Sequence, residues 1–128
     1  MSGYLTDIEQ KTLENENFRE VLYTAQHSQL VLMTLQPGEE IGLETHDNID
    51  QFIRVESGTG KAVLNGEEKQ LADGIAVVIP AGTEHNVVNT SRSEALKLYT
   101  IYSPPEHPDG TVHKTKAEAE EYEKEHHG

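Results

Sequence analysis

The segment from Gly74 to Asn89 constrains the fold more than any other part of the chain. It begins with the apolar, β-branched run Ile75–Ile79, which is typical of a strand. Pro80-Ala81-Gly82 then predicts a turn, because proline restricts φ and glycine accepts φ values that other residues avoid. His85 opens the next apolar run. The segment therefore predicts two strands with an imidazole presented where the second strand starts.

Short runs of β-forming residues separated by turn residues occupy the rest of the middle. Asn65-Gly66 is the strongest hairpin signal, since a two-residue type I′ turn needs φ > 0 at both positions. The pattern is typical of an all-β sandwich or barrel. Strands are predicted at 18–24, 29–35, 41–46, 51–56, 61–64, 75–79, 85–88 and 94–102.

The length of 128 residues predicts a single domain, and we divide it into three parts. These parts are an N-terminal extension over 1–16, a barrel over 17–103, and a loop with a short C-terminal helix over 104–128. The extension contains a candidate capping box at Thr6-x-x-Glu9. A second capping box at Thr115–Glu118 predicts where the C-terminal helix begins, and Ala119 and Tyr122 are its expected packing residues.

Composition argues against several classes of partner. Ten basic and twenty-three acidic side chains give a net charge of −13, which repels nucleic acids and anionic lipids. The chain has no cysteine, so disulfides and thiolate metal sites are excluded. Residues 1–7 lack the basic start and apolar run of a signal peptide, and no apolar run approaches the ~20 residues of a membrane helix. We expect a cytoplasmic protein without nucleic-acid or membrane partners.

Two motifs resemble the signatures of the cupin superfamily. Gly-x5-Pro-x-Gly-x2-His-x3-Asn fits Gly74–Asn89 without a gap. Gly-x5-His-x-His-x3,4-Glu-x6-Gly is similar to Gly38–Gly58 in register, but Glu44 replaces the first histidine and Gln51 replaces the glutamate. The resemblance, within the group similar to mannose-6-phosphate isomerase, implies a double-stranded β-helix, or jelly-roll barrel. It also implies a metal ion inside one end and, frequently, a homodimer.

Strand alternation gives the motif side chains a common direction. Glu44 and His46 are two residues apart, and Gln51 is in line with the apolar Ile53, so its amide should point inward and need a partner. A divalent metal ion in the barrel mouth would supply that partner. The expected ligands are Glu44, His46, Gln51 and His85.

The donor set bears on which ion would bind. Two imidazoles and one carboxylate suit non-haem Fe(II) and are compatible with Zn, Mn or Ni. Alternatives remain for individual residues: Glu44 could be a catalytic proton shuttle instead of a ligand. Gln51 could hydrogen-bond a metal-bound water or a neighbouring strand, and His85 could be a core histidine. His107 and His113 flank a turn, and nothing in the sequence sets their geometry as a second metal pair; the tail could fold over the barrel and bring His107 to the pocket rim.

Three functions follow from these residues and the resemblance. The first is a metalloenzyme acting on a small polar molecule, with chemistry like that of a sugar isomerase. A phosphorylated sugar is disfavoured because the basic residues do not cluster. The second is an Fe(II)-dependent dioxygenase, and the third is a non-catalytic module that binds a small molecule or a metal.

Overall fold

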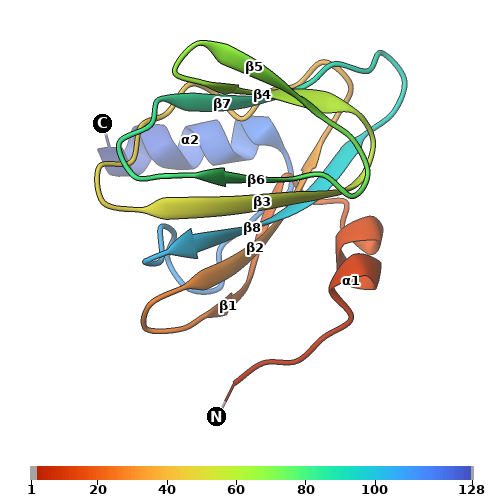
Figure 1. Ribbon diagram of the computed structural model, residues 1–128. Helices are drawn as coiled ribbons and strands as arrows, with labels where there is room; N and C mark the ends of the chain where they lie inside the picture. The colour runs from red at the N-terminus through yellow and green to blue at the C-terminus, as the bar shows by residue number, and fades with distance from the viewer. Residues whose placement is uncertain (1–2, 128) are drawn as a thin grey trace.

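The structure, a computed structural model that describes residues 3–127, consists of two antiparallel sheets with a helix near each end of the chain (Figure 1). The helices and strands are, in chain order, α1 (Ile8–Glu14), β1 (Arg19–Thr24), β2 (Gln29–Leu35), β3 (Asp50–Ser57), β4 (Gly60–Leu64), β5 (Glu67–Leu71), β6 (Ala76–Ile79), β7 (His85–Asn89), β8 (Leu96–Ser103), β9 (Val112–His113) and α2 (Lys116–His127). The strands of the larger sheet have the order β6-β3-β8-β2-β1-β9, and those of the smaller sheet have the order β5-β4-β7. Neither helix is long and apolar enough, over the described residues, to cross a membrane.

The core lies between the sheets and follows the expected alternation. On β3, Gln51, Ile53 and Val55 are buried, and on β7 His85 and Val87 are buried. Burial of apolar side chains on both sheets is the main force that holds the two layers together. The buried hydrophobic cluster comprises Phe18, Val21, Val31, Met33, Leu35, Ile53, Val55, Ala62, Leu71, Ile79, Val87, Leu96, Leu98, Tyr102 and Ala119.

The Asn65-Gly66 turn is confirmed. Asn65 has φ 49° and Gly66 has φ 83°, the pair of positive values that a type I′ turn requires. The turn joins β4 to β5, a strand whose residues from Glu67 to Gln70 are all exposed and polar. That composition explains why no apolar pattern marked β5 in the sequence.

The strand expected over 41–46 does not form. Gly42 has φ 116°, which is incompatible with a regular strand. The segment instead touches β7 through two isolated bridges, Glu40 with Val88 and Glu44 with His85. It is an extended connection, held against the smaller sheet by these bridges and by the Gly42 backbone N–H, which donates to Asn86 Oδ1 at 2.8 Å.

The N-terminal cap also differs from the expectation. The capping residue of α1 is Asp7, whose side chain accepts a hydrogen bond from the Gln10 backbone N–H at 3.1 Å, and not Thr6. A carboxylate at this position satisfies a free N–H and favours the positive end of the helix. The capping box predicted at Thr6-x-x-Glu9 was therefore wrong: the helix cap lies one residue later, at Asp7.

The C-terminal helix begins where its capping signal predicted. The Glu118 backbone N–H donates to Thr115 Oγ1 at 3.1 Å, and the Glu118 side chain accepts from the Lys114 backbone N–H at 3.3 Å. Ala119 is buried and Tyr122 is partly buried, so both lie on the packed side. The preceding strand β9 was not predicted; it pairs with β1 through Arg19–His113 and Glu20–Val112 and so ties the C-terminal segment to the larger sheet.

Two glycines with positive φ, Gly58 between β3 and β4 and Gly74 between β5 and β6, provide a test of packing. A Cβ added to Gly58 (φ +100°) would lie 2.5 Å from the Ala95 carbonyl oxygen, whereas one added to Gly74 (φ +87°) meets nothing within 4 Å. We expect Gly74→Ala to cost about 1 kcal/mol through φ alone and Gly58→Ala about 3 kcal/mol through φ and the clash. Urea unfolding of both variants measures this, and equal losses would contradict the packing argument.

Candidate metal centre

Three side chains converge at one end of the barrel. Glu44, His46 and His85 each offer one ligand atom, and these atoms all lie within 4.8 Å of one another. Glu44 and His85 are held together by reciprocal backbone hydrogen bonds, 2.9 Å from Glu44 N–H to His85 O and 2.8 Å in return. The substitution of glutamate for histidine at position 44 therefore preserves the convergence that the motif implied.

The ring of His85 is oriented by the residues just before strand β7. The Thr83 carbonyl lies 2.9 Å from His85 Nδ1, and because a carbonyl can only accept, Nδ1 carries the proton. The other nitrogen, Nε2, is then a free lone pair. It is buried and has no hydrogen-bond partner among the described residues. A buried acceptor without a partner is costly, and a metal ion would remove that cost.

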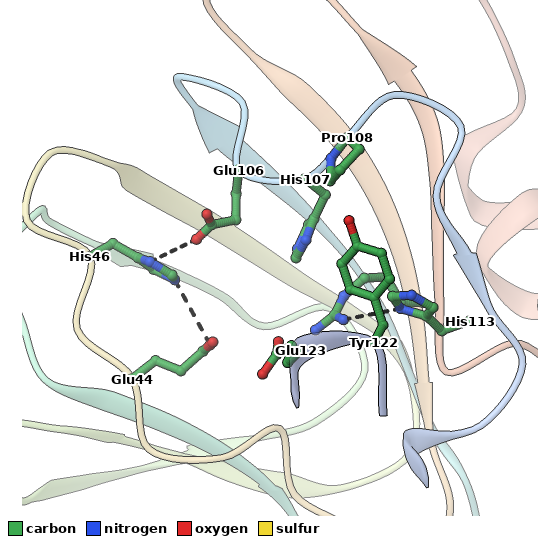
Figure 2. Close-up of a pocket in the computed structure, with 9 residues that line it drawn as sticks. Glu44, His46, Glu106, His107, Pro108, His113, Tyr122 and Glu123 are labelled. Carbon is green, nitrogen blue, oxygen red and sulfur yellow. Dashed lines mark hydrogen bonds and ion pairs between the residues drawn. The ribbon is translucent and has the colours of Figure 1, made fainter. Parts of the chain in front are cut away.

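His46 is positioned by a residue that the sequence analysis did not identify. Its Nδ1 lies 2.8 Å from Glu106 Oε2, and its Nε2 lies 3.8 Å from Glu44 Oε1 (Figure 2). The Glu106 carboxylate can only accept, so Nδ1 donates and Nε2 faces Glu44. Carboxylate–histidine–metal arrangements of this kind fix ring orientation in metal sites. In the sequence, the only sign of a role for Glu106 was its position next to His107, which was expected near the pocket rim.

The pKa values of Glu44, His46 and Glu106 depend on one another and on nearby charges. Desolvation raises the pKa of Glu44, and the nearby His46 and Arg19 oppose that shift. The hydrogen bond to Glu106 raises the pKa of His46, and the same bond lowers the pKa of Glu106. Without a metal ion, the pair at His46 and Glu106 is thus stabilised in its charged form.

Gln51 lies inside the barrel on β3. Its side chain is buried, and its Nε2 donates to Thr100 Oγ1 on the neighbouring strand β8 at 3.0 Å. Its Oε1 is buried without a hydrogen-bond partner among the described residues. The bond to a neighbouring strand thus accounts for the amide nitrogen and leaves the oxygen available.

The site opens into a cavity of about 440 Å³ beneath the C-terminal segment (Figure 2). The placement of His107 at this pocket is confirmed; its ring packs edge-on against Tyr102 at 5.2 Å, and burial lowers its pKa to about 3. His113 lines the same cavity, where its Nδ1 is 3.4 Å from Arg19 Nη1. The lining residues are Arg19, Glu44, His46, Glu106, His107, Pro108, His113, Tyr122 and Glu123.

Comparison with known proteins places the chain in a family. Residues 31–102 match the Cupin domain family, which is more than half of the chain. The chain is a cupin. The match covers the strands from β2 to β8 and includes all four expected ligands.

This cupin has close relatives in several genomes. It is 47% identical to protein YrkC of Bacillus subtilis over 91% of the chain, and it spans 65% of that relative's length. It is 47% identical to a protein of Acanthamoeba polyphaga mimivirus over 85% of the chain and 70% of that relative. The crystal structure of BH2720 from Bacillus halodurans, also 47% identical, superposes with a TM-score of 0.90 over 92% of this chain and 93% of that one. The jelly-roll barrel is thereby supported.

The His46–Glu106 pair predicts a pH-dependent stability in metal-free protein. The lowered pKa of Glu106 stabilises the folded protein fully above the ordinary carboxyl pKa of 4.5, and the raised pKa of His46 does so fully below the ordinary imidazole pKa of 6.5. Both contributions to stability are therefore complete between these two pH values. The stabilisation is lost as pH rises through the raised pKa of His46 or falls through the lowered pKa of Glu106. Glu106→Gln should be less stable than wild type by about 1 kcal/mol near pH 5.5, since both groups are partly exposed.

Denaturant unfolding of the two proteins in chelator, from about pH 4 to about pH 9, measures the difference directly. The difference should shrink at both ends of the range. A constant difference across the range would mean that charge at this pair does not contribute.

Proposed function

We propose that this cupin is a metalloenzyme that holds a divalent ion through Glu44, His46 and His85, with the Gln51 amide oxygen as a fourth ligand, and acts on a small polar molecule. One observation supports this most strongly. Both histidines have Nδ1 committed to an acceptor that cannot donate, so both turn Nε2 towards the other donors: that of His46 lies 3.8 Å from Glu44 Oε1, and that of His85 is buried with no partner among the described residues. The residues therefore fit a metal ion.

The donor chemistry narrows the ion. Two imidazole nitrogens and a carboxylate oxygen match sites for Fe(II), Mn, Ni or Zn, and an amide oxygen adds a neutral, hard donor. The bound ion would act as a Lewis acid towards a carbonyl or enediol oxygen. Glu44 has a second carboxylate oxygen with which it can hold or pass a proton beside the substrate.

The surrounding residues set what can enter. The cavity of about 440 Å³ is at the small end of ligand pockets, so the substrate is a small molecule. Burial raises the pKa of Tyr102 and lowers that of His107, so both rings are neutral near pH 7 and act as hydrogen-bonding groups. His107 Nε2 is buried and unpartnered among the described residues and can bind a ligand hydroxyl. These features favour isomerase-like chemistry of the group that resembles mannose-6-phosphate isomerase.

Metal content tests the centre. We expect near-stoichiometric Fe, Mn, Ni or Zn in wild-type protein purified without added metal, and its loss in the Glu44→Ala/His46→Ala double variant, because two of the clustered ligands are removed. The exposed His27 offers a matched control, and His27→Ala should retain the metal. Inductively coupled plasma mass spectrometry gives the result. Wild-type protein that stays metal-free after reconstitution would sink the proposal.

The two-histidine, one-carboxylate set favours a second candidate, an Fe(II)-dependent dioxygenase. Oxygen consumption separates the two: an isomerase leaves dissolved oxygen unchanged, whereas a dioxygenase consumes it together with its substrate. We expect no substrate-dependent oxygen uptake from Fe(II)-loaded protein in an oxygen-electrode screen of small polar compounds. Uptake that the Glu44→Ala/His46→Ala variant lacks would reverse the order of the two candidates.

A further inference from the structure

An arginine lies in the same cavity, and nothing in the proposed metal centre uses it. Arg19 is the first residue of β1, is only 4% exposed, and lines the cavity together with Glu44 and His46. Alternation places it on the inner face of β1 with Val21. Buried arginines are rare unless their charge is paired.

The charge of Arg19 acts across the cavity on Glu44 and Glu106, whose pKa values it lowers, but no carboxylate contacts it directly. Its Nη1 contacts His113 Nδ1 at 3.4 Å, its guanidinium lies 5.3 Å from the Phe18 ring centroid, and its Nε is buried without a hydrogen-bond partner among the described residues. No carboxylate among residues 3–127 lies within 4.0 Å of it. Burying an unpaired cation is costly, so the site is poised to gain from a bound anion.

His113 orients the guanidinium without neutralising it. A guanidinium can only donate hydrogen bonds, so the contacting His113 Nδ1 is an acceptor and the ring is neutral. Burial and the charge of Arg19 both lower the pKa of His113, in agreement with this geometry. The pairing of Arg19 with His113 between β1 and β9 sets their relative position. The positive charge therefore remains available to a ligand.

We propose that Arg19 is an anion subsite that binds a carboxylate of the substrate, so that this cupin acts on a small hydroxy or oxo carboxylic acid. The second oxygen function of that acid would reach the metal ligands. This inference rests on the proposed metal centre for the position of that second function, but not for the carboxylate contact.

The surrounding charges favour a carboxylate over a phosphate. Among the described residues that line the cavity, Arg19 is the only lysine or arginine, and three carboxylates, of Glu44, Glu106 and Glu123, line the same space. A phosphate dianion would be repelled by these and would have a single cation to offset its charge. A carboxylate carries one charge and matches the two-pronged donor geometry of one guanidinium.

Binding of matched probes tests the subsite. Isothermal titration calorimetry of glycolate, 3-hydroxypropanoate, glycolamide and inorganic phosphate would be carried out on metal-loaded and metal-free protein. We expect wild-type protein to bind at least one hydroxy acid, and Arg19→Met to weaken that binding by about tenfold or more, since a charge-assisted pair is lost. Glycolamide, which lacks the charge, should bind Arg19→Met and wild type alike. Arg54→Met, which removes an arginine that does not line the cavity, is the matched control.

Several results would overturn the subsite. They are equal hydroxy-acid affinity in Arg19→Met and wild type, absence of binding to metal-loaded wild type, and Arg19-dependent binding of phosphate that is tighter than that of every carboxylate. If Arg19→Met does not fold, a crystal structure of metal-loaded wild type with the hydroxy acid decides: a carboxylate on the guanidinium supports the subsite and any other position overturns it.

The two proposals fail differently. Metal content measured on the same samples reports the centre, whereas the Arg19 dependence of probe binding reports the subsite. Arg19-dependent carboxylate binding by a protein that takes up no metal would support the anion subsite and refute the metal centre. Stoichiometric metal with carboxylate binding that is indifferent to Arg19 would do the reverse.

Discussion

The bridge between Glu44 and His85 is the contact on which the site depends. Reciprocal backbone hydrogen bonds of 2.9 and 2.8 Å join an otherwise irregular segment to β7. Gly42 has a positive φ, and the segment forms no continuous strand there. The position of Glu44 therefore depends on this short bridge, and that of His46 on the Gly82 backbone N–H, which donates to the His46 carbonyl oxygen at 2.8 Å.

The C-terminal segment turns this ligand cluster into an enclosed site. The two-residue strand β9 anchors the segment to β1, and between β8 and β9 the chain brings Glu106 to His46 and His107 to Tyr102. The same cavity is lined by the candidate metal donors Glu44 and His46 and by the buried, positively charged Arg19. Under the proposed function, oppositely charged groups fixed in a small cavity would hold a bifunctional ligand in one orientation.

Much of this architecture was predictable from local patterns. The strand Gln29–Leu35 was located to the residue, and the Asn65-Gly66 turn and the C-terminal helix start were confirmed, because each is set by neighbours along the chain. The motifs also predicted that Glu44, His46 and His85 lie close together, as they do in the structure. The strand over 41–46 was wrong because alternation at Ile41, Leu43 and Thr45 resembles a strand but Gly42 adopts a positive φ.

The sequence by itself determined the all-β class, the inward direction of Gln51 and His85, and the chemical types of the candidate metal donors, since alternation and turn chemistry act over a few residues. The tertiary structure alone decided that Glu106, sixty positions from His46, is its partner and that Arg19 faces His113 across β1 and β9. Such contacts depend on how far the chain returns on itself and on which strands become neighbours. No local period in the sequence encodes that choice.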